Sequence, residues 1–282
     1  MKKTPYIFLS SFLILFAIFF ILPLFVAIYT ALYASRGPNM YYQFVGPRNF
    51  LRGITDIKLW EAFINMWIFT LIWIPILLVT GLALSIYVYN RNNLWSRILL
   101  VVAFLPYAVP TVIGSILWGF MYNPTSGGLT YIFSLFNLKI NLLKPESIMI
   151  ALVNIIAWQY LGFNTVILLS GLRSIPTYIY EAAIIDGATL SSIIKNIQIP
   201  LIKKYLYFIV ATTIVGAQLL FNEPYILGRL APISPNFTPN TYIYYVIKST
   251  GNLNYAASLS LVIGAVSIIS SFVLFKKIMK GD

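Results

Sequence analysis

The sequence has no cysteine and no histidine, and only 7 of its 282 residues are acidic. These absences exclude disulfides, cysteine nucleophiles, Cys/His zinc sites and a Ser-His-Asp triad within this chain. The acids are too few and too scattered for a binuclear metal site. A G-x-x-x-x-G-K-[ST] phosphate loop is also missing, so ATP binding by that motif is excluded. We therefore predict no catalytic residue, no metal site and no cofactor in this chain.

Charge is scarce as well. Charged residues make up 9% of the chain, against about 25% in soluble globular proteins, while 60% of the residues are hydrophobic and the mean hydropathy is +0.85. A soluble protein of this length needs more charged residues than this to cover its surface. The composition therefore indicates an integral membrane protein. The net charge of +12 is then explained by topology and contact with anionic lipid, and not by nucleic-acid binding.

The hydrophobic stretches predict an all-α bundle of six transmembrane helices, forming a single domain over residues 1–282. Each charge-free stretch meets or approaches the roughly 20 residues that a helix needs to cross the bilayer. The first is too long for the apolar part of a signal peptide, which has roughly 7–15 residues. Pro106 and Pro110 should kink the third helix. The predicted spans lie near 8–33, 63–89, 98–121, 148–171, 204–226 and 254–275.

Two sets of small residues at spacing four mark close helix contacts. Gly81 and Ser85 lie on the second predicted helix, and Ala256, Ser260 and Gly264 lie on the last. They can serve packing within the chain or contact with another subunit.

The placement of lysine and arginine predicts the orientation. Eleven basic residues fall on the two termini and the 90–97 and 173–204 loops, and eight are spread over three longer loops on the other side. Cytoplasmic segments are enriched in Lys and Arg. Both termini are therefore expected in the cytoplasm, with the chain in the cell membrane.

The loop at 173–203 is long for this chain and has a helical pattern of its own. Loops longer than about 12–15 residues are often functional. Pro176 suits the first turn of a helix, and Asp186-Gly187 is a turn signal because glycine accepts a positive φ. We expect two short helices around that turn, the second ending at Pro200, in a helix-in-groove contact with a cytoplasmic partner. The candidate apolar anchors are Ile184, Ile185, Ile193, Ile194 and Ile197.

The same loop carries a motif. Glu181-Ala182-Ala183 is followed by three residues and Gly187, then nine residues and Ile197-Gln198-Ile199-Pro200. This spacing resembles the "EAA" motif of permease subunits of ATP-binding-cassette (ABC) importers, with Ile199 in place of the usual Leu. The Asp186-Gly187-Ala188 continuation is similar to the carbohydrate-uptake branch, which includes maltose and glycerol-phosphate permeases. The segments at 44–50, 105–118, 123–127, 158–163, 221–225 and 251–257 also resemble that family. The segment at 227–232 departs from it, because many relatives have Gly-Gly-Pro there.

The resemblance implies a type I ABC importer permease, a non-catalytic subunit that forms half of a sugar pathway. The implied partners are a second, non-identical permease, two ATPase subunits that bind ATP and Mg, and an extracytoplasmic sugar-binding protein, besides membrane lipid. The ATPases would dock on the coupling loop, with Glu181 accepting charge-assisted bonds and Gly187 allowing the turn. The implied coupling residues are Glu181, Ala182, Ala183, Asp186, Gly187, Ala188, Ile197 and Pro200.

Polar and aromatic side chains on the fourth and fifth spans are candidates for the substrate pathway. Polar groups inside a membrane usually face the bundle interior or a water-filled cavity. The resemblance to the maltose permease points to Gln159, Leu161, Gly162, Thr165, Phe221 and Asn222, and the polar pattern adds Tyr160, Asn164, Gln218 and Glu223. Interhelical hydrogen bonding is the alternative role for each of them.

Two other functions are weighed. A six-span membrane enzyme would need clustered acids at the membrane surface, and Asp56 with Glu61 is the one close acidic pair outside the 173–203 loop. An ion-coupled secondary transporter would need ionisable residues in mid-span, which this sequence lacks. The sugar stays open between a monosaccharide such as glucose and a short oligosaccharide.

Overall fold

The computed structural model describes residues 4–36, 41–91 and 93–279, which are mostly helical. Four helices are long and apolar enough to cross a membrane, and the count rises to six if each of two bent helix pairs is one span. The predicted all-α class is thus confirmed. The one sheet among the described residues is the antiparallel hairpin of β1 (Tyr33–Arg36) and β2 (Tyr41–Phe44).

The long helices are α4 (Ile57–Arg91), α8 (Ile148–Arg173), α15 (Leu253–Met279) and a continuous N-terminal rod. The rod joins α1 (Thr4–Phe16), a π-helical turn (Ala17–Ile21) and α2 (Leu22–Ala31). The shorter elements are α3 (Arg48–Ile54), α5 (Leu94–Phe104), a 3-10 turn (Leu105–Ala108), α6 (Thr111–Met121), α7 (Gly128–Leu135), α9 (Thr177–Ile185), α10 (Leu190–Ile193), a π-helical turn (Ile194–Gln198), α11 (Ile199–Leu201), α12 (Lys203–Gln218), α13 (Asn222–Leu227) and α14 (Pro239–Thr250).

The third and fifth predicted helices differ from the prediction. Instead of one helix over 98–121, α5 and α6 meet at an angle of 106°. Pro106 lies in the 3-10 turn and Pro110 is the residue before α6, so the prolines produce a sharp bend and not a mild kink. The helix expected over 204–226 ends at Gln218, and α13 follows as a separate short helix. At its other end α12 makes a 60° angle with the 190–201 segment.

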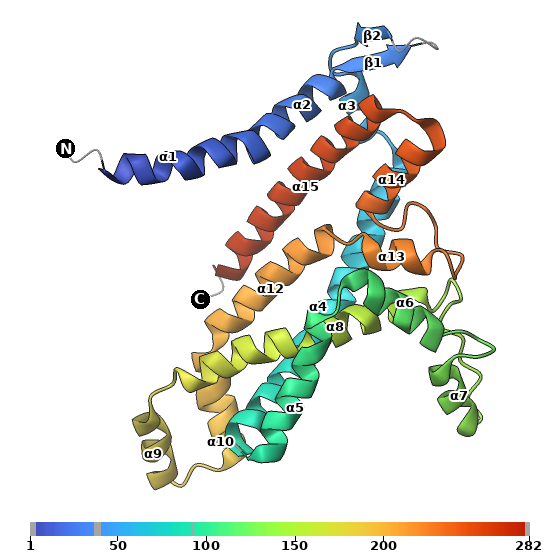
Figure 1. Ribbon diagram of the computed structural model, residues 1–282. Helices are drawn as coiled ribbons and strands as arrows, with labels where there is room; N and C mark the ends of the chain where they lie inside the picture. The colour runs from blue at the N-terminus through green and yellow to red at the C-terminus, as the bar shows by residue number, and fades with distance from the viewer. Residues whose placement is uncertain (1–3, 37–40, 92, 280–282) are drawn as a thin grey trace.

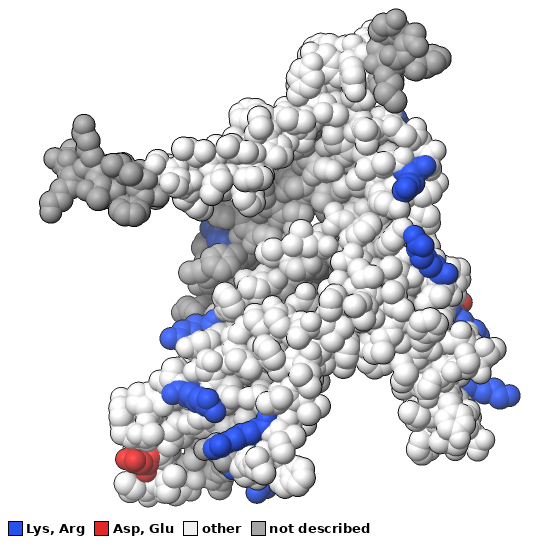
Figure 2. Space-filling model, viewed as in Figure 1, with Lys and Arg blue, Asp and Glu red and all other residues white. Residues whose placement is uncertain are grey.

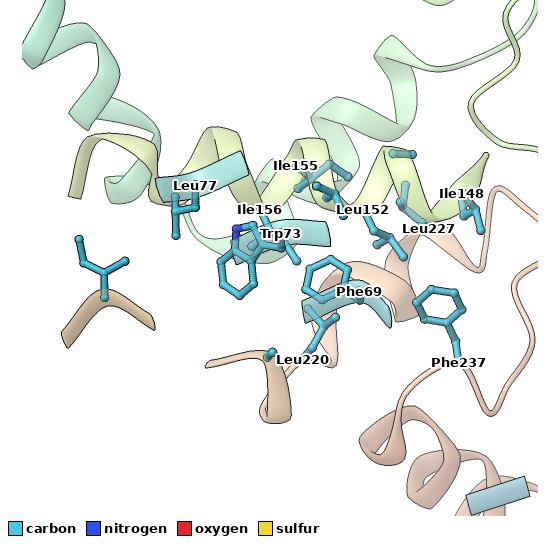
Figure 3. Close-up of a cluster of buried hydrophobic side chains, with 14 of the residues drawn as sticks. Phe69, Trp73, Leu77, Ile148, Leu152, Ile155, Ile156, Leu220, Leu227 and Phe237 are labelled. Carbon is cyan, nitrogen blue, oxygen red and sulfur yellow. The ribbon is translucent and has the colours of Figure 1, made fainter. Parts of the chain in front are cut away.

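The core forms along α4, which packs against α8 over much of its length. One cluster of buried apolar side chains joins α4, α8, α12 and the α13 region, as Figure 3 shows around Phe69, Trp73 and Ile156. A second cluster joins the first turns of α4 to α14 and α15 around Leu59, Met66 and Leu259. Gly81 packs against Leu168 of α8, which supports the intrachain role of the small residues on α4.

The N-terminal rod projects away from the rest of the chain (Figure 1), and no residue of its most apolar window is buried. The end of the rod formed by α2 contacts α15, where Asn254 Nδ2 donates to the Thr30 carbonyl at 2.9 Å. In Figure 2 the charged side chains lie along the right-hand edge of the molecule and at its lower left, with a largely uncharged surface between them. This is the surface expected of a chain that spans a bilayer.

A polar junction closes the end of the molecule that carries α3, α14 and α15. The carboxylate of Asp56 accepts hydrogen bonds from the hydroxyls of Tyr242 and Tyr255, and the Arg52 guanidinium lies 4.0 Å above the Tyr255 ring. Burial acts to raise the pKa of Asp56, but the two tyrosine hydroxyls and the backbone N–H groups of the next residues outweigh it, so this pKa lies below its ordinary value. Asp56 therefore pairs with tyrosines and not with Glu61 in a catalytic acidic pair.

Candidate functional site

A cavity of about 280 Å³ lies where α4, α6, α8, α12 and α13 converge. Trp73, Ile156 and Leu220 form an apolar part of its wall, and Figure 3 shows them coming from three different segments. Most binding cavities are apolar with a few placed polar groups, and this one follows that pattern. The remaining lining residues are Thr111, Tyr160, Phe163, Asn164, Thr212, Thr213, Gly216, Ala217, Leu219, Phe221, Asn222 and Glu223.

The amide groups of the cavity are held by the protein itself. Asn222 Nδ2 donates to Thr111 Oγ1 at 2.8 Å, which ties α13 to α6. Asn164 Nδ2 donates to the carbonyl of Tyr160 one turn earlier, also at 2.8 Å. Each amide nitrogen carries two N–H groups and these bonds engage one of them, so each side chain can still offer its oxygen and one N–H to a ligand. With Glu223 the one charged side chain of the lining, the arrangement suits a neutral ligand that carries hydroxyl groups.

Half of the ten predicted pathway residues line this cavity. They are Tyr160, Asn164, Phe221, Asn222 and Glu223. The other five belong to its supporting structure: Gln159, Leu161, Gly162, Thr165 and Gln218 are not among the lining residues. Thr165 donates to the Leu161 carbonyl, and Gln218 donates to Ser271 Oγ on α15 at 3.1 Å.

Gln159 and Gly162 hold α8 against the bend between α5 and α6. Gln159 is 3% exposed, and its Nε2 donates to the carbonyl of Val109 at 2.8 Å. Val109 lies at the break, where the helical hydrogen-bonding pattern is interrupted. A Cβ on Gly162 would lie 2.2 Å from the Ala103 carbonyl oxygen, so α8 and α5 touch backbone to backbone there. For Gln159 the geometry supports the alternative role, interhelical hydrogen bonding, whereas Gly162 allows close packing of the two helices.

Gly162→Ala is expected to destabilise the chain by about 1–3 kcal/mol or more, because the methyl group has only α5 backbone to displace. Thermal unfolding of the detergent-solubilised protein measures this. Gly264→Ala on α15 is the matched control, since nothing lies within 4 Å of a Cβ there. The control should be as stable as the native chain, because alanine favours helix over glycine. Equal melting temperatures for both variants would contradict the close contact.

The sequence did not point to several lining residues, among them Trp73, Thr111 and Thr212. Trp73 comes from α4, whose apolar sequence gave no sign of a polar cavity. Threonine inside a helix satisfies its hydroxyl on the preceding turn, as Thr212 does on the Phe208 carbonyl, so its presence is not diagnostic. The spacing of Thr212, Gly216 and Leu220 along one face of the fifth predicted span is the signal that was available.

The 173–203 loop has the predicted turn at Gly187. Helix α9 ends at Ile185, and Gly187 has φ +76°, the left-handed region that glycine accepts. The N–H of Ala188 donates to the Ala183 carbonyl at 2.9 Å, and the N–H of Gly187 to the Ile184 carbonyl at 3.0 Å. These are the two bonds of a Schellman cap. The expected positive φ at Gly187 is therefore confirmed.

The two helices of the loop differ in exposure. On α9 the side chains of Ile184 and Ile185 are 64% and 85% exposed, and Glu181, Ala182 and Asp186 are exposed as well. On the second helix, by contrast, Ile193 is buried, and Ile194 and Ile197 are half-buried against the chain itself. The prediction that all five isoleucines serve as anchors for a partner is therefore wrong for Ile193. The second helix also continues past Pro200 to Leu201.

The C-terminal end of α4 contacts both helices of the 173–203 loop. The ring of Tyr180 on α9 contacts the Tyr89 ring, with centroids 5.9 Å apart. Gln198, in the π-helical turn, is fully buried and donates to Asn90 Oδ1 at 3.4 Å. The loop is therefore packed against α4, the helix that also supplies Trp73 to the cavity.

The family follows from comparison with known proteins. The profile of the binding-protein-dependent transport system inner membrane component matches residues 78–280. The chain belongs to this family. The match covers α6, α8, α12 and α13 of the cavity and the 173–203 loop, whereas Trp73 of α4 lies before it.

Individual relatives cover nearly the whole permease. It is 26% identical over 285 residues to the probable ABC transporter permease protein YurN of Bacillus subtilis, covering 99% of this chain and 97% of that protein. It is 29% identical to the trehalose/maltose transport system permease protein MalF of Thermococcus litoralis, over 82% of this chain and 78% of the relative. The fold is similar to that of a chain in the structure of a bacterial alginate ABC transporter in complex with an alginate pentasaccharide-bound periplasmic protein. The TM-score is 0.80 at 19% sequence identity, and the alignment covers 96% of this chain and 92% of the other.

Proposed function

We propose that this permease is one half of the membrane pathway of an ATP-driven sugar importer that works by alternating access. The observation that carries the proposal is the cavity at the meeting of α4, α6, α8, α12 and α13, whose polar lining is amide, hydroxyl and aromatic with a single acid. Sugars present hydroxyl groups and apolar ring faces, which such a lining complements. The size of the cavity, about 280 Å³, suits a monosaccharide such as glucose or one unit of a short oligosaccharide.

The energy source in this proposal is a separate pair of ATPase subunits. The support is the exposed apolar tip of α9, where Ile184 and Ile185 extend from a charged loop without a partner surface of their own chain. An exposed apolar surface of this kind marks a site of protein contact. ATP-driven closure of the ATPases would move α9, and the contact of Tyr180 with Tyr89 would pass the motion to α4.

A second, non-identical permease would complete the pathway. The N-terminal rod is unburied over its apolar window, a surface that such a subunit could cover. An extracytoplasmic sugar-binding protein would deliver the ligand, since the family is binding-protein-dependent.

Reconstitution tests the proposal. Proteoliposomes that contain both permeases and the ATPases, with the binding protein added outside, should accumulate labelled sugar only when ATP is enclosed. A panel of glucose, maltose and longer glucosides would fix the substrate class. Uptake that persists without ATP and collapses with a protonophore would contradict the proposal in favour of an ion-coupled transporter.

The orientation has a direct test because the chain has no cysteine of its own. Ser191 is exposed at the start of the second coupling helix, and Ser126 is exposed in the segment between α6 and α7. With both termini in the cytoplasm, a membrane-impermeant thiol reagent should modify Ser126→Cys in intact cells and Ser191→Cys only after permeabilisation. Modification of Ser191→Cys in intact cells would reverse the orientation.

A further inference from the structure

A second cavity, of about 240 Å³, lies between α13 and α14 and the segment that joins them. In Figure 1 these helices lie far from α9, and hence on the extracytoplasmic side in the proposed orientation. Residues 227–232, where the sequence departs from many related permeases, lie at the end of α13 and the start of this segment. The lining comprises Pro224, Tyr225, Gly228, Arg229, Ile233, Ser234, Pro235, Phe237, Thr241, Tyr244, Tyr245 and Lys248. We call it the Arg229 pocket.

Two exposed cations are held in place by tyrosines in this pocket. Arg229 Nη2 donates to the Tyr225 hydroxyl at 2.6 Å, and the guanidinium lies 5.0 Å from the centroid of the same ring. The Lys248 ammonium lies 5.7 Å from the centroid of Tyr244, and the hydroxyls of the two tyrosines are 3.1 Å apart. This network fixes one arm of the guanidinium and leaves its other N–H groups available.

The described part of the chain supplies no acid to these cations. The pocket lining contains no Asp or Glu. Of the acids on the same side, Asp56 accepts from two tyrosines, Glu61 accepts from Asn236 Nδ2 at 2.7 Å, and Glu223 is buried in the central cavity. Glu146 is exposed and lies outside the pocket lining. The Arg229 pocket therefore combines two positive charges and an excess of hydrogen-bond donors, which is the chemistry that recognises a carboxylate.

The pocket also shares a wall with the central cavity. The Phe221 ring, which lines the central cavity, stacks on the Tyr225 ring with centroids 5.2 Å apart and meets the Tyr244 ring edge-on at 5.6 Å. A protein anchored in the Arg229 pocket would thus lie next to the central cavity.

We propose that the Arg229 pocket seats an acidic side chain of the extracytoplasmic binding protein and so positions that protein over the central cavity. This rests on the proposed function and adds the chemistry of the contact. Charge complementarity of this kind accelerates encounter and fixes the docking register. It also makes association sensitive to salt, because exposed charges are screened within about 10 Å at 0.1 M ionic strength.

The test is the association of the sugar-loaded binding protein with the assembled transporter in nanodiscs. The double variant Arg229→Gln/Lys248→Gln is expected to bind about tenfold more weakly or worse, with a smaller dependence on salt. The matched control is Lys139→Gln/Lys144→Gln, which removes the same charge from exposed positions outside the pocket. The control should bind almost as the native transporter does. Tyr225→Phe, which keeps the ring and removes the hydroxyl that holds Arg229, should give an intermediate loss.

Two results would overturn the proposal. Equal weakening by the control and pocket variants would reduce the effect to net charge. Normal binding with reduced uptake at saturating binding protein would assign the pocket to the sugar itself. A native transporter that fails to bind any partner protein would instead contradict the proposed function, so the two failures are distinguishable. ATPase association, measured in parallel, should be unchanged in every variant.

Discussion

Gly187→Val is expected to abolish sugar uptake while the chain stays inserted in the membrane. Gly187 has φ +76°, and no atom lies within 4 Å of a Cβ there, so the substitution acts through the backbone and not through a clash. A β-branched residue is strongly disfavoured at positive φ, at a cost of roughly 1–3 kcal/mol. The two capping hydrogen bonds of α9 would be lost, and the exposed tip of α9 would point elsewhere. Transport in vesicles and co-purification of the ATPase measure the effect.

The control is Gly187→Asn, because asparagine tolerates the left-handed region. It should retain most of the transport.

Glu181→Ala on the exposed face of α9 should weaken ATPase association by about 1.5–3 kcal/mol, roughly ten- to a hundredfold, if the carboxylate meets a charged partner. Normal ATPase association and normal transport in both Gly187→Val and Glu181→Ala would refute the coupling role of this loop.

Asn222→Leu is expected to reduce sugar-stimulated ATP turnover of the assembled transporter by about tenfold or more. The substitution removes the amide oxygen offered to the cavity and the 2.8 Å bond to Thr111 that ties α13 to α6. Loss of one hydrogen bond to an uncharged ligand costs about 0.5–1.5 kcal/mol, and an unpaired group left in the cavity adds to it. The measurement is ATPase activity with and without sugar-loaded binding protein.

Asn154→Leu is the matched control for this experiment. Asn154 Nδ2 also makes one side-chain hydrogen bond, to the Tyr122 hydroxyl at 2.7 Å, but Asn154 does not line the cavity. Its sugar-stimulated turnover should stay close to that of the native transporter at equal assembly. Equal losses in the two variants would show that Asn222 serves packing and not the ligand.

The pathway residues show how far sequence reasoning reached. Polar residues in a membrane helix were correctly expected to face inward, and Asn164, Gln159 and Thr165 are all buried. The sequence could not predict whether each of them faces the cavity or a neighbouring helix. Asn164 faces the cavity, while Gln159, five residues earlier, serves the carbonyl at Val109. That carbonyl needs a partner only because α5 and α6 bend by 106°, a geometry that the two prolines permit without fixing.

The sequence by itself determined the membrane class, the helical fold and the turn at Gly187, because hydrophobic length and glycine conformation are local properties. The tertiary structure alone decided that Trp73 of α4 meets Leu220 and Glu223 in one cavity. The tertiary structure also decided that Arg229 and Lys248, 19 positions apart, share a pocket whose lining contains no Asp or Glu. Contacts between distant segments depend on how whole helices pack and bend, and no local pattern in the chain encodes that arrangement.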